Sequence, residues 1–208
     1  MEIEHKNKVE LIGYYGGDIE HACSAWTSTS RDLTPEKKER IPAMLKRLAT
    51  EGHHTPFEKS MLHFLVTCET ASHIHILKHR IGVSVNGESA RYKELKEDKF
   101  YVPTDWPLEE QQAYIDYMIE AQAQYHRVLT RLEPVLGRKR AKESARFYLP
   151  YGNQLTLDVS FNWRSFMHFC NLRADDHAQK EIQEIAWKMI EEVREIEDFR
   201  FSLEAFGF

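Results

Sequence analysis

Residues 78–92 read KHRIGVSVNGESARY, a basic and polar stretch that follows an apolar helical pattern. Three basic residues gather just before the pattern breaks at Gly82, and a further arginine follows at Arg91. Guanidinium groups bind phosphate through paired hydrogen bonds. We therefore expect this stretch to hold an anionic ligand. The alternative is a solvated basic loop, because lysine and arginine are mostly exposed in folded proteins.

The composition is that of a globular chain. Its 208 residues are 42% hydrophobic and 29% charged, which is enough for one domain with a sizeable core. The net charge of -5 argues against binding to a nucleic-acid backbone. Apolar runs of signal-peptide or membrane-span length are absent, so we expect a cytoplasmic protein with no membrane partner.

The cysteines argue against a disulfide framework or a zinc knuckle. Cys23, Cys68 and Cys170 have no CxxC spacing, and each lies in apolar surroundings. A reducing compartment is the expectation that follows.

Hydrophobic patterns predict a single α+β domain over residues 1–208. Strand formers and two-residue alternation predict strands, and apolar stripes at helical spacing predict helices. Thr34-Pro35 favours a helix start, Pro42 a kink, and Gly52 a helix end. The predicted strands are 8–15, 62–68 and 155–161; the further predicted helices are 70–81, 106–136 with a stop at Pro134 and Gly137, 138–149, and a last one with a stripe from Ile182 to Ile196.

The segment Gly52–Glu58, GHHTPFE, is a candidate binding element. The side chains of Thr55 and Glu58 fit a capping box, which predicts a short helical turn. Free amides at such a turn could bind a phosphate or a ring carbonyl. An ordinary helix cap is the alternative interpretation.

A second candidate element runs over residues 162–179, where polar and aromatic residues alternate too densely for a plain core helix. Asn162, Arg164, His168 and Arg173 could donate hydrogen bonds to carbonyls and phosphates. The segment also offers Asp175 or Asp176 as a cap for the next helix, and a pairing of His177 with Glu181. Arg146 lies in the basic helix of 138–149, most of whose charges we expect to be solvated.

These three stretches resemble, in the same order, the motifs of the flavin-dependent thymidylate synthase family. The family signature of Arg-His-Arg, a spacer, Ser and then Arg-Tyr is similar to His79-Arg80, Ser89 and Arg91-Tyr92. The GHxTPFE and NLRADxHAQ elements are matched at 52–58 and 171–179. The resemblance covers most of the chain.

The resemblance implies an antiparallel sheet flanked by long helices, assembled as a homotetramer with active sites between subunits. It also implies binding of FAD, dUMP, 5,10-methylenetetrahydrofolate and NADPH. NADPH would reduce the flavin, the folate would give one carbon to C5 of the uracil, and the flavin would return a hydride. A protein nucleophile is not implied, which agrees with cysteines that have no neighbouring base.

Site residues carry over from the family by position. Arg173 would be catalytic, because a guanidinium facing the uracil imide would stabilise negative charge on the ring. Ser89 has no adjacent base and is assigned to binding, and His53 would line the folate or flavin face. The implied FAD ligands are Thr55, Lys78, His79, Arg80, Gly87, Asn162, Trp163, Arg164 and His168; the implied dUMP ligands are His75, Lys78, Gly87, Glu88, Ser89, Ala90, Arg91, Arg146 and Arg173.

Three positions depart from the family pattern. Lys78 replaces the first arginine of the signature and loses its planar two-pronged donor. His75 stands where glutamine is frequent, and Gly87 stands where an acidic or amide residue is common. The loop before Ser89 is also one residue longer, so ligand contacts there are expected to differ.

Two other classes of function remain open from the residues. A metal-dependent hydrolase or deaminase could use His75 and His79 on one helix face, with His53 or His177 as a third ligand. HExxH and CxxC patterns are absent from the sequence, so no metal is expected. The other class is a noncatalytic nucleotide-binding module of the same fold.

Overall fold

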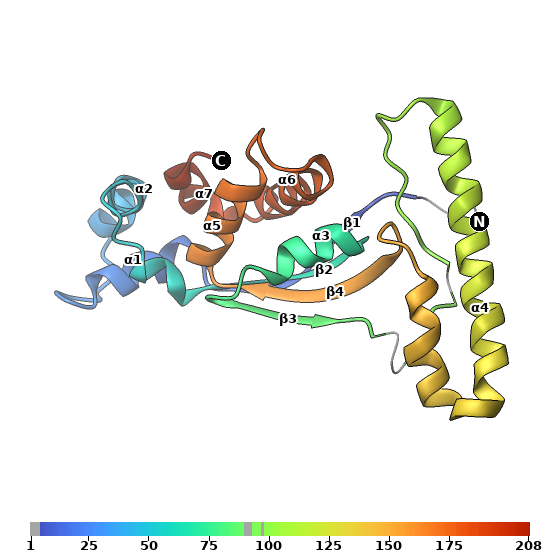
Figure 1. Ribbon diagram of the computed structural model, residues 1–208. Helices are drawn as coiled ribbons and strands as arrows, with labels where there is room; N and C mark the ends of the chain where they lie inside the picture. Colours follow the sequence, from blue (N-terminus) through green and yellow to red (C-terminus); the bar gives the residue numbers. More distant parts are fainter. Residues whose placement is uncertain (1–4, 90–92, 97) are drawn as a thin grey trace. The chain divides into compact units, whose positions relative to one another are not determined.

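The computed structural model describes residues 5–89, 93–96 and 98–208 (Figure 1). The predicted dUMP ligands Ala90 and Arg91 lie outside these described residues. Residue contacts divide the chain into two compact units. Unit 1 comprises residues 1–8, 66–76 and 86–157, and unit 2 comprises residues 9–65, 77–85 and 158–208. The prediction of one domain over residues 1–208 stays a prediction.

Four strands form one antiparallel sheet in the order β1-β2-β4-β3. The three predicted strands are confirmed to within one residue at each end. The fourth, β3, lies at the sheet edge inside the stretch we expected to be a loop. Their bounds are β1 Lys8–Tyr15, β2 Met61–Glu69, β3 Val83–Gly87 and β4 Gln154–Phe161.

The helices of unit 2 carry four of the nine predicted flavin residues, one in η1 and three in α5. The predicted start of α2 is confirmed, because the Thr34 hydroxyl accepts a hydrogen bond from the Lys37 amide at 3.4 Å. The prediction that one helix closes the chain is wrong, since two short helical segments follow α6. The elements are α1 Asp18–Trp26, α2 Pro35–Thr50, η1 Thr55–Lys59, α5 Trp163–Arg173, α6 Lys180–Arg194, η3 Glu197–Phe199 and α7 Arg200–Phe206.

Unit 1 holds the long helix α4, Leu108–Ala145, which breaks at Gly137 with φ of 74°. This break agrees with the predicted stop and with a separate basic helix after it. The chain then continues into η2, Arg146–Tyr148. Helix α3, Thr70–Leu77, ends four residues before the predicted end at Ile81, so the basic residues that follow it are not helical.

Aromatic packing fills the core of unit 2. The indole of Trp163 stacks on Phe199 with ring centroids 4.7 Å apart, and Phe166 stacks on Phe64 at 5.6 Å. The predicted apolar stripe of α6 is buried along its length, from Ile182 to Val193. In the described part of the chain, every helix is too short or too polar to span a bilayer.

A buried hydrogen-bond network joins α1, α7 and the start of β2 in unit 2. The Ser202 hydroxyl donates to Asp18 Oδ1 at 2.5 Å, and His21 Nδ1 lies 2.9 Å from the same hydroxyl oxygen. Because the Ser202 proton is already used, His21 donates from Nδ1. Its Nε2 then accepts from the Ser60 hydroxyl at 2.7 Å. His21 is therefore held as one neutral tautomer.

At pH values below about 6.5, the free energy of unfolding should decrease because of His21. Burial lowers the pKa of His21 from 6.5 to about 3, so between these values the unfolded chain binds a proton that the folded chain refuses. The stabilisation is complete above pH 6.5 and is lost as the pH falls toward 3, at up to about 1.4 kcal/mol per pH unit. Urea denaturation of wild type and His21→Gln across this range measures the slope.

The free energy of unfolding of His21→Gln should depend less steeply on pH than that of wild type, since glutamine keeps a polar amide but does not titrate. His177→Gln is the control for the exchange of histidine for glutamine, because the side chain of His177 is exposed, and its slope should lie closer to that of wild type than the slope of His21→Gln does. Equal slopes for wild type and His21→Gln would contradict the assignment.

Candidate active site

The start of α5 is fixed to the turn that follows the basic residues 78–80. The Asn162 side chain caps the helix by accepting a hydrogen bond from the Ser165 amide at 2.9 Å. The backbone amide of Asn162 donates to the Gly82 carbonyl at 3.0 Å, and the Ser165 hydroxyl donates to the Ile81 carbonyl at 2.7 Å. Two of the predicted motifs are thus joined by backbone and side-chain hydrogen bonds.

Helix α5 has two faces, which explains its dense mixture of aromatic and polar residues. Trp163, Phe166 and Phe169 are fully buried in the core. Arg164 and His168 are exposed four residues apart, and so lie on one side of the helix. The expectation that this segment is not a plain core helix agrees with these two faces, of which the buried one is apolar apart from Ser165.

A cavity of about 340 Å³ lies along the exposed face of α5. It contains three of the predicted flavin residues, Asn162, Arg164 and His168. The spacing of Arg164, His168 and Asn171 along one helix face is the signal that would have found Asn171. Phe206 was missed because α7 was not predicted. The full lining is His54, Glu58, Ile81, Asn162, Arg164, Ser165, Met167, His168, Asn171 and Phe206.

An ion pair links the GHHTPFE element to α5. Arg164 donates from Nη1 to Glu58 Oε1 at 2.6 Å, with both side chains partly exposed. The predicted capping box is wrong. Residues 55–59 form a 3₁₀ turn whose cap position is His54, and no side chain caps it. A proline in the first turn and the bond from the Phe57 amide to the His54 carbonyl favour this tighter geometry.

The second link joins the signature residue His79 to Arg173, the last residue of α5. Arg173 donates from Nε to His79 Nε2 at 3.1 Å, and both side chains are half-buried. The imidazole also packs edge-on against Phe169 with ring centroids 5.0 Å apart. The residue predicted to be catalytic therefore contacts a residue predicted to bind flavin.

The other predicted flavin residues in unit 2 lie in different settings. Thr55, Lys78 and Arg80 are exposed. The side chain of Trp163 is fully buried, and its indole N–H has no hydrogen-bond partner among the described residues. Trp163 therefore packs in the core as the structure stands, and its flavin contact stays a prediction.

Unit 1 carries the remaining predicted nucleotide residues. Glu88 is fixed at the end of β3, because its amide donates to the Thr156 carbonyl at 2.8 Å and its carboxylate accepts from Lys93 at 2.8 Å. A Cβ on Gly87 would lie 3.2 Å from Leu157, so this position has little room for a side chain. His75 and Ser89 are half-buried, and Arg146 is exposed in η2.

The histidine metal site considered from the sequence is not formed. His79 lies beyond the end of α3, so it cannot share a helix face with His75. His53 is exposed and lies 3.7 Å from the Glu51 carboxylate. The described residues contain no group of three or more His, Cys, Asp or Glu side chains placed to hold a metal ion.

The region after α5 also differs from the expectation. His177 pairs with Asp175 at 2.8 Å, so the predicted pairing with Glu181 is wrong. The cap position of α6 is Gln179 without a side-chain bond, which means that neither Asp175 nor Asp176 caps this helix. Asp175 instead accepts a hydrogen bond from the His177 amide, which lowers the pKa of its carboxyl group.

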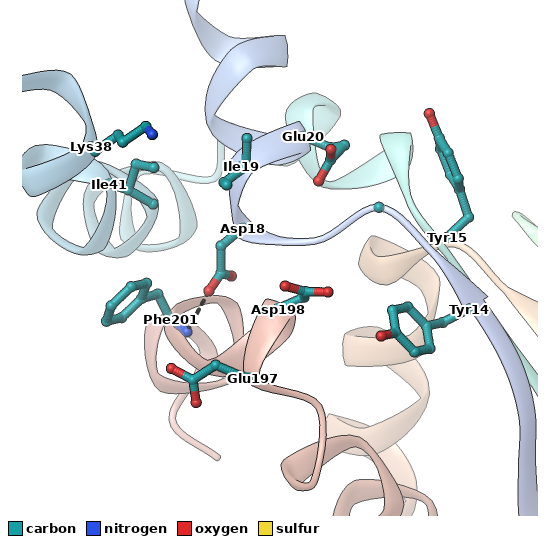
Figure 2. A pocket seen from close by; sticks show the side chains of 11 residues that line it. Tyr14, Tyr15, Asp18, Ile19, Glu20, Lys38, Ile41, Glu197, Asp198 and Phe201 are labelled. Atoms are coloured by element: carbon teal, nitrogen blue, oxygen red, sulfur yellow. Dashed lines mark hydrogen bonds between the residues drawn. The ribbon is translucent and has the colours of Figure 1, made fainter. Parts of the chain in front are cut away.

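A larger cavity of about 550 Å³ lies elsewhere in unit 2 and contains none of the predicted site residues (Figure 2). Four carboxylates line it against a single lysine, Lys38. Asp18 is held by the Phe201 amide, and burial raises the pKa of its carboxyl group. Because carboxylates repel phosphates, this cavity is a poor match for a nucleotide. Its acidic residues are Asp18, Glu20, Glu197 and Asp198.

Comparison with solved structures matches the whole fold. The UMP/dUMP methylase PolB from Streptomyces cacaoi, in its complex with 5-Br dUMP, superimposes with a TM-score of 0.82 at 26% identity, covering 99% of this chain and 96% of PolB. The PolB complex with 5-Br UMP gives the same TM-score at 25% identity. The fold is therefore that of a nucleotide methylase.

Sequence relatives define the family. The flavin-dependent thymidylate synthase of Thermosipho africanus is 32% identical over 200 residues, covering 89% of this chain and 85% of the relative. That of Pseudothermotoga lettingae is 30% identical over 190 residues, covering 89% and 84%. The family profile described as "Thymidylate synthase complementing protein" matches residues 10–197. The chain belongs to this family, the flavin-dependent thymidylate synthases.

Substitution of Gly82 should damage the junction between the basic turn and α5. Gly82 has a φ of +64°, and an added Cβ would lie 2.3 Å from both Asn162 Nδ2 and Ser165 Oγ. Gly82→Ala should therefore combine backbone strain with overpacking. We expect a loss of about 2–4 kcal/mol in the free energy of unfolding, measured by urea denaturation.

Gly207→Ala is the matched control. Gly207 is in the left-handed region, with φ of 86° and ψ of 23°, and an added Cβ would have no atom within 4 Å. Its cost should be the backbone strain alone, about 1–2 kcal/mol. A loss in Gly82→Ala no larger than in the control would show that the junction tolerates a side chain.

Proposed function

We propose that the protein converts dUMP to dTMP by reductive methylation, with 5,10-methylenetetrahydrofolate as the carbon donor and NADPH-reduced FAD as the hydride source. One observation carries the proposal beyond family membership. Two side-chain bonds, Glu58 to Arg164 and His79 to Arg173, connect the three motifs of the family through α5. Residues distant in sequence thus converge on one helix of unit 2, α5.

The cavity beside α5 supports the flavin part of the proposal. Its volume of about 340 Å³ suits one portion of FAD, at the lower end of the range of ligand pockets. Arg164 would offer guanidinium hydrogen bonds to the pyrophosphate. Ile81 and Phe206 would contact the apolar part of the cofactor, and the side chain of Ile81 is otherwise 90% exposed. Bound flavin would supply the hydride chemistry.

Arg173 suits the proposed role at the uracil ring. Its Nε is bonded to His79, whereas its two terminal nitrogens make no hydrogen bond to another described residue. These terminal groups would donate to the imide of the uracil and favour negative charge on the ring. Donors fixed in advance of the reaction stabilise such charge most effectively. Glu88, Ser89 and Arg146 are proposed to bind the nucleotide.

Self-association as a homotetramer is part of the proposal. Apolar side chains are exposed on two neighbouring strands, with Ile12 44%, Tyr14 49% and Met61 51% accessible. Exposed apolar groups on adjacent elements are typical of protein contact surfaces. The cysteines of the described chain are free, which agrees with the proposed reducing cytoplasm.

The decisive experiment follows tritium release from dUMP labelled at C5, with and without added FAD. The wild-type protein should release tritium only with FAD, and its flavin absorption band should be bleached by NADPH. Arg173→Ala should lower turnover by a factor of about 10²–10³, the usual cost of a lost charge-stabilising donor, while the flavin content stays unchanged.

Arg40→Ala is the control, since Arg40 is exposed on α2 and lies outside every motif. It should retain full turnover. Colourless protein that takes up no FAD would refute the flavin assignment, and turnover of Arg173→Ala within threefold of wild type would remove Arg173 from the chemistry.

Methylation of UMP is a second candidate activity, favoured by the likeness to PolB over 99% of the chain. The same tritium assay with labelled UMP, at matched enzyme and folate concentrations, compares the two substrates through kcat/KM. We expect dUMP to be preferred, because the matched relatives are thymidylate synthases. A kcat/KM for UMP equal to or above that for dUMP would establish the second activity instead.

A further inference from the structure

The hydrogen bond between Arg173 and His79 fixes the protonation state of the histidine. A guanidinium group has only donors and keeps its proton at all accessible pH values. The Nε2 atom of His79, 3.1 Å from Arg173 Nε, must therefore accept through its lone pair. The proton of the neutral ring is then on Nδ1, so a protonated His79 cannot make this bond.

The same bond restricts the orientation of Arg173. The Nε–H direction lies in the guanidinium plane, so fixing it fixes the directions in which both terminal nitrogens point. Arg173 is the last residue of α5 and is otherwise a long, rotatable side chain. His79 thus removes the main freedom that the guanidinium would have in front of a substrate.

The imidazole is itself held by the helix that carries Arg173. Its ring packs edge-on against Phe169 at 5.0 Å and against His168 at 6.0 Å. Phe169 is fully buried and lies four residues before Arg173, on the same side of α5. One helix therefore sets both the place of the ring and the place of the guanidinium that the ring contacts.

We propose that His79 is a positioning residue that orients Arg173 for reaction with the uracil ring, and that it does so only as the neutral imidazole. This inference rests on the role of Arg173 in the proposed function. Arg173 and His168 face His79 from α5, and Lys78 and Arg80 flank it in sequence. A proton on His79 would remove the acceptor and add a positive charge beside the guanidinium.

Kinetics at saturating FAD separate positioning from simple flavin binding. Glutamine at residue 79 can place an amide oxygen near the position of Nε2 and does not titrate. At saturating FAD, His79→Gln should retain more of the wild-type kcat than a variant without an acceptor, and it should lose less activity on acidification than wild type. His79→Phe keeps a ring without an acceptor, and its kcat should fall at least tenfold while KM for dUMP changes less.

His126→Gln is the control, because His126 is also a hydrogen-bonded, partly buried histidine, bound to Asp98 at 2.8 Å in unit 1. Its pH profile should match that of wild type. If excess FAD restores the kcat of His79→Phe, or if His79→Gln keeps the full acidic loss of wild type, the positioning role is wrong.

A measurement without catalysis tests the contact itself. Imidazole ¹⁵N NMR of the flavin-free protein should show the Nδ1–H tautomer for His79, and Arg173→Met should raise the pH at which this ring titrates. An unchanged titration in Arg173→Met would overturn the proposal. If Arg173→Met shifts the titration of His79 but the wild type releases no tritium, the proposed function is refuted. The contact between His79 and Arg173 would still stand.

Discussion

The capping of α5 by Asn162 is the interaction on which the rest of the site depends. Its side chain accepts a hydrogen bond from the Ser165 amide, and its backbone amide donates to the Gly82 carbonyl. The Ser165 hydroxyl donates to the Ile81 carbonyl. The first turn of the helix is thereby fixed to the end of the basic segment. Because an α-helix is rigid over eleven residues, a register set at Asn162 also determines where Arg173 lies.

The strands were predictable wherever one face is buried. In β2 and β4 alternate side chains are buried, so the two-residue period appears in the sequence. The edge strand β3 has exposed Ser84, Asn86 and Gly87, and its short apolar pattern does not differ from that of a loop. Helix α3 ends early for a related reason. The positive φ of Gly82 and the bonds to α5 favour a turn where apolar spacing alone favoured a helix.

The residues of the candidate site were predicted one motif at a time. Hydrophobic periodicity could not show which of them contact one another. Motif resemblance selected Arg164, His168, His79 and Arg173, but the bonds of Glu58 to Arg164 and of His79 to Arg173 cross long sequence separations. No local pattern encodes such pairs. The contribution of Phe206 depends on α7, a seven-residue helix too short to show a clear amphipathic period. The predicted cap at Thr55 failed because a proline-containing 3₁₀ turn leaves the capping geometry unformed.

The buried indole of Trp163 gives the protein an optical property. Of the four tryptophans, it alone is fully buried, and it stacks on Phe199 with no hydrogen bond at its N–H among the described residues. An indole in such apolar surroundings fluoresces at shorter wavelength than one in contact with water. Its sequence neighbours Asn162 and Arg164 line the cavity beside α5. A chromophore bound there would quench this short-wavelength emission by energy transfer. The decrease in emission would therefore measure binding of the chromophore.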